Sequence, residues 1–132
     1  QSKELKDNIE LLPGKKIIFT NGDEKWAKKI LYALGINNSV EKIFDIIKSD
    51  YIPKPQKKAY SNMIEMCKVN PKECIFFEDT KINLLEAHNF GMVTIHIDEK
   101  FDYEKEYDLE HFVDFKFKSI EFALKTINKH LK

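Results

Sequence analysis

The sequence predicts an α/β fold, with a parallel sheet and helices on both of its faces. Two observations carry this prediction. Short apolar stretches alternate along the chain with stretches of helical periodicity, an order typical of parallel strands joined by crossover helices. One short stretch, residues 75–77, is entirely apolar, as expected of a strand covered on both faces. No repeat or linker interrupts the 132 residues, so we expect a single domain over residues 1–132.

Helices are expected where apolar residues recur every three or four positions. The expected helices cover residues 3–12, 26–34, 59–67, 80–90 and 119–131. Pro13 stops the first helix, while Gly35 and Gly91 follow the second and the fourth, where glycine commonly ends a helix. Thr80 and Ser119 are candidate N-caps of the last two helices.

Strands are expected where apolar residues run together between turn signals. The expected strands cover residues 15–20, 44–47, 75–77, 92–97 and 113–117, the last at a sheet edge. Pro53 and Pro55 enclose Lys54 in a rigid loop after the second strand. Residues 98–111 are mostly charged and are expected to form a solvated loop.

Composition excludes several classes of function. The chain has 22 basic and 22 acidic residues, without the basic excess typical of nucleic-acid binders. No apolar run approaches the roughly 18 residues of a membrane span, and no signal peptide opens the chain. The spacing of Cys67 and Cys74 matches no zinc or redox motif. We therefore expect a cytoplasmic protein with reduced thiols and with neither nucleic acid nor membrane as a partner.

Polar residues follow three of the expected strands. Residues 20–22 end the first strand, Lys54 lies in the loop after the second, and residues 78–79 directly follow the third. The carboxyl ends of parallel strands meet at one edge of a sheet, where open α/β folds place their ligands. A threonine hydroxyl, turn amides and a lysine suit a phosphate group, and two carboxylates suit Mg²⁺. The sequence therefore predicts a site for a phosphate and a divalent cation.

Each of these residues also has a structural interpretation. Thr20 can end a strand and cap the following helix, and an acid pair at a helix start is favoured by the helix dipole. Lys54 by itself is one of many lysines. His88 and His96 are interpreted as packing or surface residues rather than as ligands. The combination of residues is much more specific than any one of them.

In this order, the three polar stretches resemble motifs of the haloacid dehalogenase-like (HAD) hydrolases. Residues 17–22 resemble the second motif, an apolar strand that ends in Ser or Thr. Residues 52–55 resemble the third motif, a lysine before a proline. Residues 75–83 resemble the fourth motif, an apolar strand with an acid pair and an Asp or Asn four residues later. Residues 11–15 and the helix after the second motif resemble the pyrimidine 5′-nucleotidase branch in particular.

The resemblance implies a Rossmann-like fold and a role for each site residue. The implied roles are catalysis for Thr20 and Lys54, phosphate binding for Thr20, Asn21, Gly22 and Lys54, Mg²⁺ binding for Asp79 with help from Glu78, and orientation of these groups by Asn83. The implied reaction is hydrolysis of a phosphate monoester through an aspartyl-phosphate. The implied substrate is a small phosphorylated metabolite such as a nucleoside monophosphate.

One departure from the family pattern is large. Family members attack with an aspartate in a D-x-D-x-[TV] motif, and no aspartate of this chain lies in such a pattern. The strand that carries it is central in the family sheet, between the strands of the second and fourth motifs. The family's cap domain is also missing, apart from residues 1–14, which are interpreted as its end and a lead-in helix. Because the nucleophile motif and the cap are missing, and the chain begins with Gln1 rather than Met, we expect the C-terminal portion of a longer enzyme.

Other interpretations stay open or are disfavoured. A HAD-like domain that has lost catalysis and serves in binding or regulation is the main alternative, and a sugar-phosphate mutase of the same superfamily also fits. A receiver-like signalling domain is disfavoured, because its acid pair should precede its threonine and lysine. Here Thr20 and Lys54 precede the acids.

Overall fold

The computed structural model describes residues 3–105 and 108–131. Helices and strands alternate along it as expected. The elements are α1 (Lys3–Leu11), β1 (Ile17–Phe19), α2 (Glu24–Leu34), β2 (Lys42–Phe44), α3 (Lys57–Cys67), η1 (Pro71–Glu73), β3 (Ile75–Glu78), η2 (Lys81–Asn83), α4 (Leu84–Asn89), β4 (Val93–Ile97), β5 (Phe115–Phe117) and α5 (Ile120–His130). Over this part of the chain, no helix has the length and apolar content that a membrane crossing requires.

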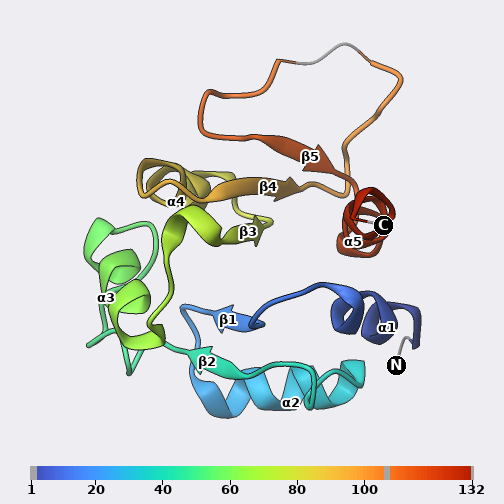
Figure 1. Ribbon diagram of the computed structural model, residues 1–132. Coiled ribbons are helices and arrows are strands. Elements are labelled where there is room, and N and C mark those ends of the chain that lie inside the picture. Colours follow the sequence, from blue (N-terminus) through green and yellow to red (C-terminus); the bar gives the residue numbers. More distant parts are fainter. Residues whose placement is uncertain (1–2, 106–107, 132) are drawn as a thin grey trace.

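The strands form two parallel sheets, one of β1 and β2 and the other of β3, β4 and β5 (Figure 1). In the described ranges no ladder of hydrogen bonds joins β1 to β3. The break falls between the strands of the second and fourth motifs, the position where the resemblance places the absent nucleophile strand. The α/β fold with parallel strands is therefore confirmed, and the sheet is divided at that position.

Helices cover both faces of the two sheets. In β1, Ile17 and Phe19 pack into a cluster of buried side chains from α3 and α4, while Ile18 packs into a second cluster with α1, α2 and α5. In β3, Phe76 and Phe77 divide between the same two clusters. Residues 76 and 77 thus pack on both faces of their strand, as predicted. Ile75, at the start of the strand, is 43% exposed, so the prediction that all three residues are covered is wrong at that position. The two layers of helices bridge the two sheets.

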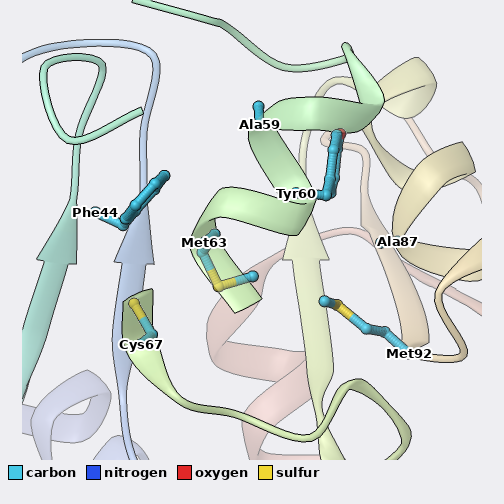
Figure 2. Close-up of a cluster of buried hydrophobic side chains, with 7 residues drawn as sticks. All are labelled: Phe44, Ala59, Tyr60, Met63, Cys67, Ala87 and Met92. Atoms are coloured by element: carbon cyan, nitrogen blue, oxygen red, sulfur yellow. The ribbon is translucent and has the colours of Figure 1, made fainter. Parts of the chain in front are cut away.

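The first cluster is built around α3 (Figure 2). Its Tyr60 and Met63 side chains lie between Phe44 of β2 and Met92, which precedes β4. The exposed fraction of Tyr60 is 0% and that of Phe44 is 1%. Burial of such a side chain stabilises the fold by roughly 1.5–3 kcal/mol, so this cluster joins α3 firmly to the elements on either side.

The second strand lies earlier in the chain than predicted, because the chain turns at Asp45. β2 covers Lys42–Phe44, whereas the expected strand covered residues 44–47. The buried Asp45 carboxylate accepts hydrogen bonds from the backbone N–H groups of Glu24 (2.9 Å) and Lys48 (2.9 Å). These bonds curl residues 45–48 into a turn and attach it to the start of α2.

Most predicted helix ends are confirmed. Ser119 caps α5 by accepting from the Phe122 N–H, and Gly35 and Gly91 have φ values of 76° and 99°. Thr80 makes no capping bond, so this prediction is wrong. The 3₁₀ turn η2 separates residue 80 from α4, so the helix begins three residues later than it would after a Thr80 cap.

Two further predictions concern segments that the structure describes in part. The segment 98–111 contains neither helix nor strand in its described residues, as predicted, and residues 106–107 lie outside the described part. The lead-in helix is present as α1, which packs against α5, and residues 1–2 lie outside the described part (Figure 1).

Candidate functional site

The predicted lysine lies where the carboxyl ends of β1 and β3 meet. The Lys54 ammonium donates to the Glu78 carboxylate at the end of β3 (2.7 Å) and to the backbone carbonyl of Phe19 at the end of β1 (2.9 Å). The side chains of Lys54 and Glu78 are each only 8% exposed. The two sheets are therefore joined at this edge by a buried ion pair rather than by backbone ladders.

Aromatic rings complete the surroundings of this ammonium. Its nitrogen lies 4.9 Å from the ring centroid of Phe19 and 5.6 Å from that of Phe76. The negative face of an aromatic ring attracts a cation, most strongly where water is excluded. Lys54 is thus held in one place by a carboxylate, a carbonyl and two rings.

Asn21 holds the lysine loop against the loop after β1. Its side-chain oxygen accepts from the Lys54 backbone N–H (2.8 Å), and its side-chain nitrogen donates to the Lys54 carbonyl (3.1 Å). The resemblance implies phosphate binding for Asn21, and the structure adds this pair of hydrogen bonds to the Lys54 backbone. The amide positions the loop that places Lys54 between the sheets.

Thr20 and Gly22 form a small turn beside this loop. The Gly22 N–H donates to the Thr20 hydroxyl oxygen at 3.0 Å, which leaves the hydroxyl proton free to donate elsewhere. The Gly22 carbonyl accepts from the Ile46 N–H (3.1 Å), so the turn is attached to the end of β2. Thr20 is partly exposed and Gly22 is exposed, so a ligand can reach both.

The two acids after β3 have different surroundings. One oxygen of Glu78 accepts from Lys54 and from the Asn83 side-chain nitrogen (3.1 Å), and the other accepts from the Thr80 N–H (3.1 Å). Asp79 is exposed, whereas both carboxylate oxygens of Glu78 are bonded within the protein. Asp79 is therefore the acid open to a cation.

The predicted site residues thus form one connected region. Asn21, Lys54, Glu78 and Asn83 are linked in series by hydrogen bonds, with Thr20 and Gly22 beside Asn21 and with Asp79 beside Glu78. A cleft of about 460 Å³ lies elsewhere, along the outer edge of β2 between α2 and α3, and no predicted site residue lines it.

The donor set fits a magnesium ion in part. Over the described ranges, no three His, Cys, Asp or Glu side chains come together as a metal site. Mg²⁺ is usually bound by only one or two carboxylates, with waters and substrate phosphate completing its shell. Asp79 can supply one such carboxylate. The remaining ligands must come from waters, from substrate or from outside the described residues.

Two residues bonded to this region were missed as functional candidates. The Tyr60 hydroxyl donates to the backbone carbonyl of Asn83, and the His96 Nε2 lies 3.1 Å from the backbone carbonyl of Asp79. Both side chains are buried. The helical spacing around Tyr60 indicated only a core position, and His96 was interpreted as packing; no sequence signal shows which carbonyl a buried side chain reaches.

One protein family matches this chain over most of its length. The family model of haloacid dehalogenase-like hydrolases matches residues 3–91. The chain belongs to this family. The match includes all three motifs of the HAD-like hydrolase and every site residue predicted from the sequence. No curated protein matches the chain.

Solved structures share the fold of this HAD-like hydrolase. A HAD phosphatase from Thermococcus onnurineus has a TM-score of 0.75 and 21% identity, covering 98% of this chain and 57% of its own. L-2-haloacid dehalogenase from Xanthobacter autotrophicus, with chloropropionic acid covalently bound, has a TM-score of 0.74 and 17% identity, covering 92% of this chain and 58% of its own. The putative HAD-hydrolase YfnB from Bacillus subtilis, bound to magnesium, has a TM-score of 0.73 and 17% identity, covering 92% of this chain and 54% of its own. The chain thus spans a little over half the length of these structures.

Proposed function

We propose that these residues are the phosphate- and metal-holding part of a magnesium-dependent phosphatase of the pyrimidine 5′-nucleotidase branch. The supporting observation is the buried pair of Lys54 and Glu78 at the carboxyl ends of β1 and β3, beside the exposed Asp79. A buried ion pair loses hydration that its mutual attraction only partly restores, and apolar side chains would fill the same space at less cost. Its presence at the strand ends favours a ligand site over packing.

The residues of this chain would hold the phosphoryl group in three ways. The Thr20 hydroxyl can donate its proton to a phosphate oxygen, since its own oxygen already accepts from Gly22. An ammonium has three N–H donors, and two of those of Lys54 are used within the protein. The third can bind a phosphate oxygen or the attacking carboxylate. Mg²⁺ held by Asp79 would neutralise negative charge on the phosphate during transfer.

The attacking aspartate would come from a strand outside these 132 residues. A parallel strand seated between β1 and β3 would pair with the edge of each and bring a carboxylate at its end next to Lys54. The carboxylate oxygen would attack phosphorus, and the phosphorus–oxygen bond to the leaving alcohol would break, with the alcohol taking up a proton. Water would then hydrolyse the aspartyl-phosphate and release phosphate.

A second candidate is a HAD-like domain that binds a phosphorylated ligand without turnover. Two observations favour it: no D-x-D-x-[TV] motif occurs in the chain, and no complete cluster of metal-binding side chains occurs in the part that the structure describes. Reading the coding sequence upstream of Gln1 separates the two. An apolar strand ending in D-x-D-x-[TV] supports the phosphatase.

The decisive experiment measures phosphate release by the full gene product. The substrates are p-nitrophenyl phosphate, pyrimidine and purine nucleoside monophosphates and a hexose phosphate, each with Mg²⁺ and with EDTA. We expect Mg²⁺-dependent hydrolysis with a preference for pyrimidine nucleotides. Asp79→Asn should reduce it by at least about 100-fold, whereas the control Asp7→Asn, in the exposed part of α1, should not. Saturable binding without turnover would support the second candidate instead.

A further inference from the structure

The turn that carries Asp79 and Asn83, residues 79–83, is here called the acid turn. Buried side chains from two other elements bond its two ends: His96 of β4 at the Asp79 carbonyl and Tyr60 of α3 at the Asn83 carbonyl. We propose that Tyr60 and His96 are positioning residues that fix the acid turn and thereby set where the Asp79 carboxylate lies. The part of the proposal that concerns a cation at Asp79 rests on the proposed function. The part that concerns the acid turn rests only on the contacts of Tyr60 and His96.

Tyr60 is a rigid donor at the second end of the turn. Its side chain has no exposed surface, and its ring meets Phe19 and Phe76 edge-on at centroid distances of 5.3 Å and 6.2 Å. Burial raises the pKa of the Tyr60 hydroxyl far above its ordinary value, so the hydroxyl keeps its proton. The ring contacts fix the direction of the O–H bond toward the Asn83 carbonyl. Phenylalanine would pack equally well, so the hydroxyl serves the bond rather than the core.

His96 is the donor at the first end. It is 7% exposed and faces Glu78 across the β3–β4 ladder, which places it beside the start of the turn. A carbonyl oxygen can only accept, so the hydrogen bond to Asp79 places the imidazole proton on Nε2. The other ring nitrogen, Nδ1, is buried without a partner in the described structure. A buried unpaired polar atom costs stability, so the bond that Nε2 makes is the favourable polar contact of this buried ring.

The position of the Asp79 carboxylate depends on these two bonds, because its own side chain has little else to hold it. Its hydroxyl neighbour, Thr80, is 3.4 Å away, at the limit of a hydrogen bond. Inside the turn, the Asn83 N–H donates to the Thr80 carbonyl (3.0 Å), which shapes the turn but does not attach it to the sheet. Attachment comes from Tyr60 and His96 at the ends and, between them, from two bonds to Glu78, one from the Asn83 side chain and one from the Thr80 N–H. An exposed ion pair also joins Lys81 to Glu110.

The test uses four variants of the full gene product. Tyr60→Phe and His96→Phe remove one donor each and keep a ring of similar size. His96→Gln keeps an N–H donor at about the reach of Nε2 and is the rescue variant. Tyr32→Phe is the matched control, since Tyr32 is 70% exposed on α2. Urea denaturation confirms that each variant is folded before it is compared.

Three readouts follow the turn and its carboxylate. Long-range ¹H–¹⁵N spectra of histidine-labelled protein should show His96 as the Nε2–H tautomer, assigned by the signal that His96→Gln removes. Amide exchange in the peptide that spans residues 79–84 should rise about three- to tenfold in Tyr60→Phe and in His96→Phe, as expected for loss of one hydrogen bond. The Mg²⁺ concentration that gives half of the maximal stabilisation of the protein against unfolding in urea should rise several-fold in the same two variants. Tyr32→Phe should match the wild type, and His96→Gln should lie near it.

Different failures have different meanings. An Nδ1–H tautomer of His96 would overturn the proposal that Tyr60 and His96 fix the acid turn. Exchange in residues 79–84 that is no faster in Tyr60→Phe and His96→Phe than in Tyr32→Phe would also overturn it. Faster exchange with an unchanged Mg²⁺ concentration for half-maximal stabilisation would overturn the positioning role of Tyr60 and His96. The turn would then loosen without moving the Asp79 carboxylate. If the wild type had the Nε2–H tautomer and the variants exchanged faster, but Mg²⁺ did not stabilise the wild type, the proposed function would fail and the bonds to the acid turn would stand.

Discussion

Replacing Lys54 with methionine should destabilise the protein far more than breaking any exposed ion pair. Methionine fills much of the space of the lysine stem but leaves the Glu78 carboxylate without its cation at 8% exposure. Removing one partner of a buried pair typically costs about 3–5 kcal/mol, because the other charge stays buried and uncompensated. Glu78 keeps its bonds from Asn83 and from the Thr80 N–H, which places the expected loss nearer about 3 kcal/mol.

The matched control is Lys125→Met. Lys125 pairs with Glu4 at 2.8 Å, a distance close to that of the buried pair, but the two side chains are 65% and 57% exposed. Exposed pairs contribute about 0–1 kcal/mol, so this variant should lose less than about 1 kcal/mol. The assay is urea denaturation followed by circular dichroism, with the free energy of unfolding extrapolated to water.

A double-mutant cycle completes the test. Adding Glu78→Gln to Lys54→Met removes the uncompensated carboxylate and should recover part of the lost free energy of unfolding. The effects of the two substitutions should therefore not be additive. Equal costs for Lys54→Met and Lys125→Met, or additive costs in the cycle, would refute the conclusion that the two sheets are joined here by a buried ion pair.

Three further predictions follow from the same contacts. Burial opposes ionisation of Asp45, but hydrogen bonds from the backbone N–H groups of Lys48 and Glu24 outweigh it and lower the pKa of its carboxyl group. The contribution of Asp45 to stability should be complete above the unfolded pKa of about 4 and fall as the pH drops through the lower folded value. In urea denaturation between pH 6 and pH 3, the free energy of unfolding should therefore decline less steeply in Asp45→Asn than in the wild type. Thr20→Val should raise the KM for a phosphate monoester at least tenfold in the full gene product while Thr20→Ser stays near the wild type, and equal KM values would exclude a hydroxyl bond to phosphate. The 132-residue chain alone should show no normal Mg²⁺-dependent turnover in a phosphate-release assay, and vigorous hydrolysis by it would contradict a nucleophile supplied from outside.

Much of the fold could be predicted because its signals are local. The apolar run of residues 75–77, the glycines that end α2 and α4, and the Ser119 cap each depend on neighbours within a few residues. The gathering of Thr20, Lys54 and the acid pair was also predictable, because the carboxyl ends of parallel strands share one edge. The position of β2 and the Thr80 cap were wrong, because Asp45 and η2 redirect the chain through contacts of their own.

The chemistry of each site residue, by contrast, was decided by tertiary structure. From the sequence alone, Glu78 and Asp79 are two adjacent acids of equal standing. In the fold, Glu78 is buried against Lys54, which comes from another sheet position 24 residues away, and Asp79 is left exposed to bind a cation. The roles of Tyr60 and His96 depend in the same way on which backbone carbonyl lies within reach. Sequence order determines which side chains reach the site, but burial and hydrogen-bond partners determine which of them are free to act, and those partners are distant in the chain.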